Sequence, residues 1–463
     1  MEKRESFGSR LGFILVSAGC AIGCGNVWKF PWVCGENGGG AFVFVYLICL
    51  LILGLPTMVI EFALGRASRS SPVRMYHVLE PKGTKWHIHG YFAMIGNLLL
   101  MMFYTTVSGW MMYYFVKFMN GSYTDFFTTV IADNGTEILK NIGYSSMIGS
   151  PSVCLLFMGI VVVLGFFILA FNFQKVFERM TKSMMVVLIF LMIALMIHSL
   201  TLDGAAEGLS FYLKPNLSKI NGSMVVNAMN QAFFTLSLGI GAMEIFGSYL
   251  SKDHSLMGES FRIILLDPFV AITAGLIIFP ACYTYGIEPD SGPELLFTTM
   301  ATVFHQMNGG RWWGALFFLF MIFASFSTVL AVFENILACV RELTHWSRRK
   351  GCLICCLGMF LLSIPCALGY NVFKGFVPFA SGTAFLELWD FLLSNVFLPV
   401  GTVIMILFCV SKRYGWGWEK FIAEANTGTG VKVRQWMKPI FMIVVPIAVI
   451  VIFVYGLITF QYR

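Results

Sequence analysis

Residues 19–31 read GCAIGCGNVWKFP, a glycine-rich and partly polar stretch inside an otherwise apolar segment. A second such stretch, TLSLGIGAM at residues 235–243, interrupts another apolar segment five segments further along the chain. An interruption within a bilayer leaves backbone amide and carbonyl groups unpaired, at a cost of roughly several kcal/mol each. The two stretches therefore predict paired broken helices that bind something polar. Glycines that merely allow close helix packing are the alternative for either stretch alone.

The composition indicates a membrane protein with many spans. Of the 463 residues, 58% are hydrophobic and 12% are charged, against roughly 45–50% and about 25% in soluble domains. A helix needs about 20 apolar residues to cross a bilayer. Segments of this kind predict about eleven crossings, near residues 11–33, 40–64, 88–118, 152–171, 183–200, 224–250, 258–285, 311–342, 352–370, 383–410 and 437–460.

Basic residues fall mostly into alternate loops. About 23 of the 31 Lys and Arg lie in the amino-terminal segment and near residues 65–86, 174–182, 251–262, 341–350 and 411–438. The positive-inside rule places these segments in the cytoplasm. An odd number of spans across the cell membrane then leaves the carboxyl end outside. This asymmetry accounts for the net charge of +7 without a nucleic-acid partner. The first segment lacks a cleavage site and is interpreted as a retained helix.

The chain contains no low-complexity linker, so residues 1–463 are expected to form a single transmembrane domain. Its twelve Cys are scattered mostly through apolar spans, which is typical of small buried residues. Its seven His form no HExxH or similar metal motif. Because we find neither a metal cluster nor a paired nucleophile and base, we do not expect an enzyme.

Polar side chains inside membrane spans are costly and therefore mark candidate functional sites. The first span carries Asn26, the sixth carries Thr235 and Ser237, the seventh carries Asp267, and the eighth carries Ser327 and Thr328. Amide, hydroxyl, carboxylate and carbonyl oxygens are the ligands that a hard cation prefers. Half-helix amino termini favour an anion, and half-helix carboxyl termini favour a cation. A zwitterion together with a metal ion would suit such a site.

Several motifs together resemble the neurotransmitter:sodium symporter family. They are Arg10-Leu11-Gly12, residues 19–31, ENGGGAF at 36–42, QAFFTLSLGIGA at 231–242 and YLSKD at 249–253. The resemblance runs nearly end to end, and the short tails are similar to the bacterial branch. It implies an all-α membrane fold with eleven transmembrane helices and with helices 1 and 6 unwound. Two inverted five-helix repeats would span about 11–200 and 224–410, and helix 11 about 437–460.

The resemblance also implies two sodium sites. The first would use the carbonyl of Ala21, the side chains of Asn26 and Asp267, the carbonyl and hydroxyl of Thr235, and the substrate's own carboxylate. The second would use the carbonyls of Gly19, Ile22 and Ala324 and the hydroxyls of Ser327 and Thr328. For either hydroxyl of the eighth span alone, a bond back to its own helix is the alternative.

A substrate site is implied between these ions. The substrate carboxylate would meet the amides of Cys24 and Gly25 and the hydroxyl of Tyr104. The rest of the pocket would be lined by Cys20, Ala21, Leu100, Phe234, Thr235, Ser237, Ile240, Thr328 and Val332. Gly23 stands where monoamine carriers of the family have an aspartate for the amine. An amino acid with a neutral side chain is therefore expected.

Two gates are implied as well. The outer gate would pair Lys29 with Asp390 above a lid of Tyr104 and Phe234. Lys cannot make the planar bidentate contact of the family's Arg, so a looser latch is expected. The inner gate would pair Arg4 with Glu342 near Ser248 and Tyr249. A snorkelling lysine and an ordinary surface ion pair are the respective alternatives.

Asp267 stands where many family members have asparagine, and Ala271 lacks the hydroxyl of chloride-dependent relatives, so no chloride requirement is expected. The resemblance thus implies a sodium-coupled symporter that imports a small neutral, hydrophobic or aromatic amino acid by alternating access. Its partners would be substrate, sodium and the lipid bilayer, with no obligate protein partner. A channel, an amino-acid-binding sensor and a carrier of a different small amine remain alternatives. Glu244 and Glu334 are two further carboxylates in predicted spans, and each could bind a proton or serve a structural role.

Overall fold

The first membrane segment is broken near its middle. The computed structural model describes residues 7–131, 137–171, 173–287, 296–379 and 383–459. Helix α1 (Arg10–Ala21) begins where the Ser9 hydroxyl accepts a hydrogen bond from the Gly12 amide, and it ends where Ile22 turns extended. The chain resumes as the π-helical turn η1 (Gly25–Lys29) and helix α2 (Phe30–Glu36), at 49° to α1.

The second break lies between α11 (Gly222–Thr235) and α12 (Glu244–Tyr249). Within it Ser237, Gly239 and Gly241 all have positive φ, at 51°, 94° and 69°. A Cβ at Gly239 would lie 2.2 Å from the Leu398 carbonyl oxygen, so only glycine fits there. Helical structure therefore stops at both glycine-rich stretches. That these stretches are unwound parts of transmembrane helices 1 and 6 stays a prediction.

Nine further helical segments are long and apolar enough to cross a bilayer in the described part of the chain. They are Gly40–Ser68, Ile88–Asn120, Pro151–Leu169, Val176–Leu200, Leu256–Thr284, Gly310–Thr344, Arg348–Ala367, Phe385–Val410 and Gln435–Ile458. The bent pair of α1 and α2 adds a tenth span, whereas α11 and α12 are each too short to be counted. The exact number of eleven transmembrane helices stays a prediction.

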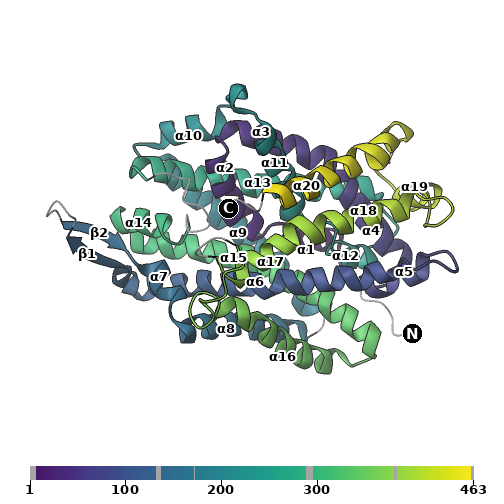
Figure 1. The fold of residues 1–463 in the computed structure, drawn as a ribbon, viewed down its shortest axis with the longest axis horizontal. Coiled ribbons are helices and arrows are strands. Elements are labelled where there is room, and N and C mark those ends of the chain that lie inside the picture. The colour runs from purple at the N-terminus through teal and green to yellow at the C-terminus, as the bar shows by residue number, and fades with distance from the viewer. Residues whose placement is uncertain (1–6, 132–136, 172, 288–295, 380–382, 460–463) are drawn as a thin grey trace.

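These segments correspond to helices of the ribbon. They contain α3 (Gly40–Cys49) with α4 (Leu55–Ser68), α6 (Ile88–Asn120), α8 (Pro151–Leu169), α9 (Arg179–Leu200), α13 (Leu256–Thr284), α15 (Gly310–Thr344), α16 (Arg348–Ala367), α17 (Phe385–Leu392) with α18 (Leu398–Val410), and α20 (Val445–Thr459). The long helices α6 and α15 pack together through aromatic rings, with the centroids of Tyr114 and Phe318 5.0 Å apart. They run through the middle of the bundle in Figure 1.

Short elements cap the two ends of the bundle. One end carries the hairpin of β1 (Phe127–Ile131) and β2 (Glu137–Asn141), with α7 (Gly143–Ile148), α10 (Ala205–Leu213) and α14 (Thr299–Gln306). The strands are antiparallel, with Phe127 opposite Asn141. The other end carries α5 (Pro72–Leu79) and α19 (Trp418–Ala425) (Figure 1). The hairpin lies between the apolar segments predicted near residues 88–118 and 152–171.

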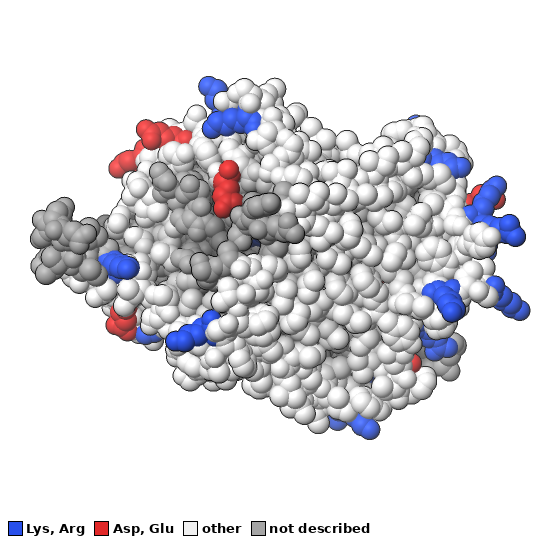
Figure 2. Space-filling view, viewed as in Figure 1, with Lys and Arg blue, Asp and Glu red and all other residues white. Residues whose placement is uncertain are grey.

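The two ends of the bundle differ in the charged residues that they carry. Figure 2 shows a broad band without Lys, Arg, Asp or Glu across the middle of the visible face. Basic side chains gather at the end that carries α5 and α19, whereas the opposite end shows both signs. This pattern is what a chain spanning a bilayer with a basic cytoplasmic side would have.

All twelve Cys are free, and eleven of them are buried.

Candidate functional site

The first cluster of polar groups lies between the break in the first segment and α13. The Asn26 amide donates to the carboxylate Oδ1 of Asp267 over 2.8 Å and to its backbone carbonyl over 3.0 Å. The Thr235 hydroxyl lies 2.9 Å from Asn26 Oδ1 and 3.1 Å from Asp267 Oδ1. All three side chains are at most 2% exposed. Three oxygens suited to a hard cation therefore converge in a dry interior.

Tyr46 on α3 completes this cluster. Its hydroxyl donates to the second carboxylate oxygen of Asp267 over 2.9 Å, and the side chain is fully buried. Sequence reasoning missed Tyr46, because a lone tyrosine in an apolar span has no spacing that links it to α13. Its hydrogen bond fixes the orientation of the carboxylate while the other oxygen faces Asn26 and Thr235.

A second cluster of oxygens joins α1 to α15. The Ser327 hydroxyl lies 3.0 Å from the carbonyl of Gly19, 3.4 Å from that of Ile22 and 2.9 Å from that of Ala324. The Thr328 hydroxyl lies 3.1 Å from Gly19 O and 3.4 Å from Ile22 O. Gly19 is in the last turn of α1 and Ile22 directly follows the helix, where free carbonyls give the helix end a partial negative charge. The five residues predicted as the second sodium site thus lie together.

Between the clusters, Tyr104 on α6 faces the break. Its hydroxyl accepts a hydrogen bond from the Cys24 amide over 2.7 Å. A Cβ at Gly23 would lie 2.1 Å from the Tyr104 hydroxyl and 2.4 Å from the Thr328 hydroxyl, so the glycine leaves room for these two groups. The amino terminus of the half-helix after the break therefore meets a hydroxyl at the position predicted for a substrate carboxylate.

The other predicted pocket residues surround this point from several elements. Gly25 approaches α11 closely, since its added Cβ would lie 3.1 Å from Thr235 Cα and 3.3 Å from the Phe234 ring. The Gln231 amide donates to the Gly25 carbonyl over 2.7 Å, a contact not predicted from the sequence. The remaining predicted residues are all at most 7% exposed, and they are Cys20, Ala21, Cys24, Leu100, Ser237, Ile240 and Val332.

The break between α11 and α12 has its own supporting residues. Glu61 on α4 accepts from the amides of Gly239 and Met243 over 2.6 and 2.9 Å. Side-chain amides donate hydrogen bonds to the backbone carbonyls of the break. Asn97 donates to Ile240 O over 2.6 Å, and Asn335 donates to Gly241 O over 3.1 Å. Buried backbone groups need such partners. Glu61 was not predicted from the sequence, although an acidic residue in an apolar span is a signal that could have identified it.

Glu244 opens α12 directly beyond this break. Its carboxylate accepts from the Tyr76 hydroxyl over 3.2 Å, and the side chain is 1% exposed. Its second oxygen has no hydrogen-bond partner within the described residues. Glu334 differs, because it binds the Tyr249 hydroxyl over 3.1 Å and the guanidinium of Arg348 over 2.6 Å. The neutralising guanidinium indicates a structural role for Glu334.

At the predicted outer gate, Lys29 Nζ lies 3.1 and 3.2 Å from the two carboxylate oxygens of Asp390. It also lies 3.3 Å from the Ser394 hydroxyl and 3.9 Å from the centroid of the Phe234 ring. The ammonium group thus combines an ion pair with a cation–π contact. The lysine side chain is only 12% exposed, which does not fit a residue that snorkels freely to water.

At the predicted inner gate, Arg4 lies outside the described residues. Glu342 accepts from the Ser71 amide over 3.0 Å and from the Ser71 hydroxyl over 2.8 Å. Ser248 and Tyr249 are buried on α12, and the Phe7 ring lies 6.1 Å from that of Tyr249. Glu342, Ser248 and Tyr249 therefore lie on elements that meet at one end of the bundle, and the partner role of Arg4 stays a prediction.

The fold and these clusters define a class of protein: a multi-pass membrane transporter whose paired broken helices converge on buried oxygen ligands. Comparison with known families makes the assignment specific. The chain matches the sodium:neurotransmitter symporter family over residues 4–142 and 123–463 and belongs to that family. It is accordingly a sodium-dependent transporter and not an enzyme.

Individual relatives agree with this assignment. The chain is 32% identical over 457 residues to an uncharacterized sodium-dependent transporter of Bacillus subtilis, YhdH, covering 98% of this chain and 97% of that protein. It is 26% identical to the sodium-dependent serotonin transporter of Drosophila melanogaster, over 99% of this chain and 77% of that protein. The crystal structure of MhsT in complex with L-phenylalanine superposes with a TM-score of 0.84 at 34% identity, covering 98% of this chain and all of MhsT.

Proposed function

We propose that this chain is a sodium-coupled symporter that imports a small neutral, hydrophobic or aromatic amino acid by alternating access. The observation that carries the proposal is the convergence of both helix breaks on Asn26, Thr235 and Asp267. Amides at the start of one half-helix suit a carboxylate, and carbonyls at the end of the other suit a cation. The substrate carboxylate and the sodium ion would therefore bind next to one another, between the two helix breaks.

Two sodium ions would bind in different ways. The first, between Asn26, Thr235, Asp267 and the Ala21 carbonyl, would also contact the substrate carboxylate, so sodium and substrate would each strengthen binding of the other. The second would bind the carbonyls at the end of α1 and the hydroxyls of α15, in place of the present hydroxyl–carbonyl hydrogen bonds. It would thereby fasten α1 to α15, and its loss would free α1 to move.

The side-chain end of the substrate would meet an apolar wall. Leu100, Phe234, Ile240 and Val332 supply this wall, and Gly23 offers no carboxylate for an amine. The L-phenylalanine bound by MhsT supports an aromatic amino acid as the first substrate to test. A substrate without a carboxylate would lack a partner for the amides of Cys24 and Gly25.

Chloride would be unnecessary, because Asp267 already provides a negative charge beside the first cation. The Tyr46 hydroxyl donates to one oxygen of this carboxylate, and the other oxygen faces Asn26 and Thr235.

Two gates would close the substrate site. Lys29 and Asp390 would close the outer side. Arg4 and Glu342, near Ser248 and Tyr249, would close the inner side. The protein would lie in the plasma membrane, with the basic end of Figure 2 in the cytoplasm and the chain folded as two inverted repeats.

The test is uptake of labelled L-phenylalanine into liposomes that contain the purified protein. An inward sodium gradient should drive accumulation, and replacing sodium by potassium should abolish it. Replacing chloride by gluconate should change nothing. Binding without accumulation would identify a sensor, and flux that only equilibrates the label would identify a channel. Competition by a panel of amino acids and amines would then define the substrate.

A further inference from the structure

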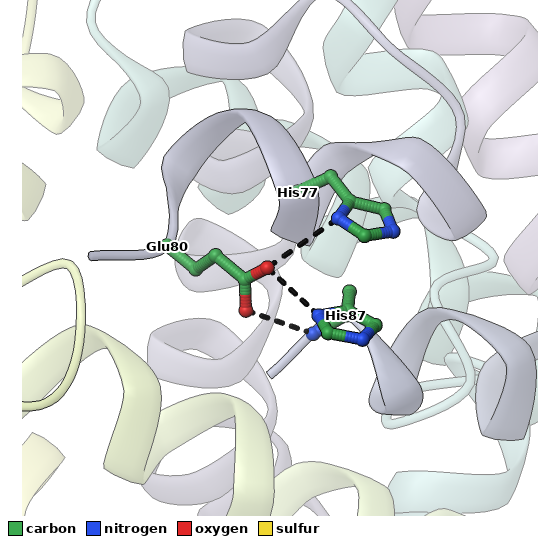
Figure 3. A group of neighbouring side chains, drawn as sticks. All are labelled: His77, Glu80 and His87. Carbon is green, nitrogen blue, oxygen red and sulfur yellow. Dashed lines mark hydrogen bonds and ion pairs between the residues drawn. The ribbon is translucent and has the colours of Figure 1, made fainter. Parts of the chain in front are cut away.

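Three side chains gather where α5 meets α6, far from the sodium clusters along the chain. His77 lies in the last turn of α5, Glu80 follows this helix, and His87 precedes the first residue of α6. The Glu80 oxygen Oε1 lies 3.4 Å from His77 Nδ1 and 2.8 Å from His87 Nδ1. Figure 3 shows both imidazoles turned toward this one carboxylate. The spacing of these three residues in the sequence matches no standard metal motif.

The spacing of these atoms suits a small divalent metal. One ligand atom from each residue lies within 4.8 Å of the other two. Zinc bonds to nitrogen and oxygen are about 2.0–2.2 Å, which puts two ligands of a tetrahedral ion about 3.3 Å apart. The distances from Glu80 Oε1 to His87 Nδ1 and to His77 Nδ1, 2.8 and 3.4 Å, lie on either side of this value. An imidazole lone pair lies in the plane of its ring, and the two rings now stack with 8° between their planes. One ring would therefore rotate for both Nδ1 atoms to face a single ion.

The carboxylate is oriented by backbone and hydroxyl groups. Its Oε2 accepts from the His87 amide over 3.2 Å and from the Thr84 hydroxyl over 3.4 Å. Glu80 is thus anchored through one oxygen while the other faces the two imidazoles. Support of this kind around a ligand is typical of metal sites. The His77 side chain is 50% exposed and that of His87 28%, so the site is open to solvent for a fourth, water ligand.

The two imidazole rings also lie against one another. Their rings stack with centroids 4.2 Å apart and 8° between the planes. A plain hydrogen-bonded cluster would need a proton on each of the two Nδ1 atoms that face Glu80. A metal ion would replace both protons and let each neutral imidazole donate its lone pair. Imidazole with carboxylate favours zinc, copper or nickel over the alkali cations of the transport site.

We propose that His77, Glu80 and His87 form a binding site for a divalent transition metal of the zinc class, which fastens α5 to the start of α6. The site is distinct from both sodium clusters in ligand type and in place. It lies between α5 and α6, at the end of the bundle where basic side chains gather (Figures 1 and 2). At its other end α5 begins next to Ser71, which binds Glu342. The metal would therefore restrain a short helix that connects this loop to the predicted inner gate.

The test is a calorimetric titration with zinc. The purified full chain in detergent is first treated with a chelator to remove bound metal. The wild type should bind one equivalent that is lost, or weakened by at least roughly tenfold, in His77→Ala, His87→Ala and Glu80→Gln. His345→Asn is the matched control, because His345 is exposed on another loop and Asn tolerates its φ of 56°. The control should bind zinc like the wild type.

Hydrogen exchange provides a second readout that does not depend on transport. Zinc should slow exchange of the amides in residues 77–89 in the wild type and in the control, but not in the three site variants. Sodium-driven uptake by each variant would show that it is folded. The proposal is overturned if the site variants bind zinc with wild-type affinity and stoichiometry, or if the folded wild type binds no zinc.

Discussion

Replacing Asp267 by Asn tests the charge balance of the transport site most sharply. The substitution keeps the shape of the side chain and removes one negative charge from a group that is fully buried. Asn26 and Thr235 lie 2.8 and 3.1 Å from the carboxylate oxygen that would face the ion. An ion bound by these groups would therefore lose its only full negative charge from a protein side chain in this cluster.

The size of the effect follows from Coulomb's law. Two unit charges about 4 Å apart at an effective permittivity of about 20 interact by roughly 4 kcal/mol. The amide oxygen of Asn and a rearranged hydrogen bond from Tyr46 would recover part of this energy. We therefore expect a net loss of about 1.4–2.8 kcal/mol, which raises the sodium concentration for half-maximal uptake by roughly tenfold to hundredfold.

The assay is initial uptake of labelled L-phenylalanine into liposomes over a range of sodium concentrations, with and without chloride. The Asp267→Asn variant should need more sodium for half-maximal uptake, and uptake by the wild type should not depend on chloride. Asp203→Asn, an exposed change in the loop between α9 and α10, is the control. An unchanged sodium dependence in a folded Asp267→Asn variant would show that this carboxylate does not bind the ion.

Three further substitutions probe other parts of the site. Ser327→Ala removes a hydroxyl that contacts two carbonyls of α1, and sodium titration of uptake should show roughly tenfold weaker activation. Gly23→Ala places a methyl group 2.1 Å from the Tyr104 hydroxyl, so equilibrium binding of labelled substrate should be lost while thermal unfolding still shows a folded protein. Glu244→Gln keeps a hydrogen bond to Tyr76, so the pH dependence of uptake should be unchanged; a shifted profile would instead assign Glu244 a proton.

Local signals in the sequence located much of the site. Glycines and polar residues occur together at 19–26 and again at 235–241, and this paired occurrence in two apolar segments pointed to helix breaks. The adjacent hydroxyls of Ser327 and Thr328 were predicted to be functional because they are polar groups in an apolar span. The structure places both hydroxyls against the carbonyls of α1. Their grouping with α1 came from the family resemblance, since spacing within one helix does not say which helix it faces.

Residues whose role depends on distant packing were not found from the sequence. Tyr46 and Glu61 reach the site from α3 and α4, and each meets residues about 180 or more positions away. The His77, Glu80 and His87 group depends on the turn between two helices, which no periodic pattern encodes. Helices and their polar interruptions can be predicted from a single sequence because both depend on neighbouring residues. Tertiary contacts join residues far apart in the chain, so a single sequence does not predict them.

The most direct test of the central claim is equilibrium binding of labelled L-phenylalanine to the purified protein as sodium replaces potassium at constant ionic strength. If the two helix breaks bind an amino acid and sodium together, binding should be strong in sodium and should disappear in potassium. Sodium affinity should likewise rise when substrate is present, since the coupling is reciprocal. Equal binding in sodium and in potassium would contradict the account.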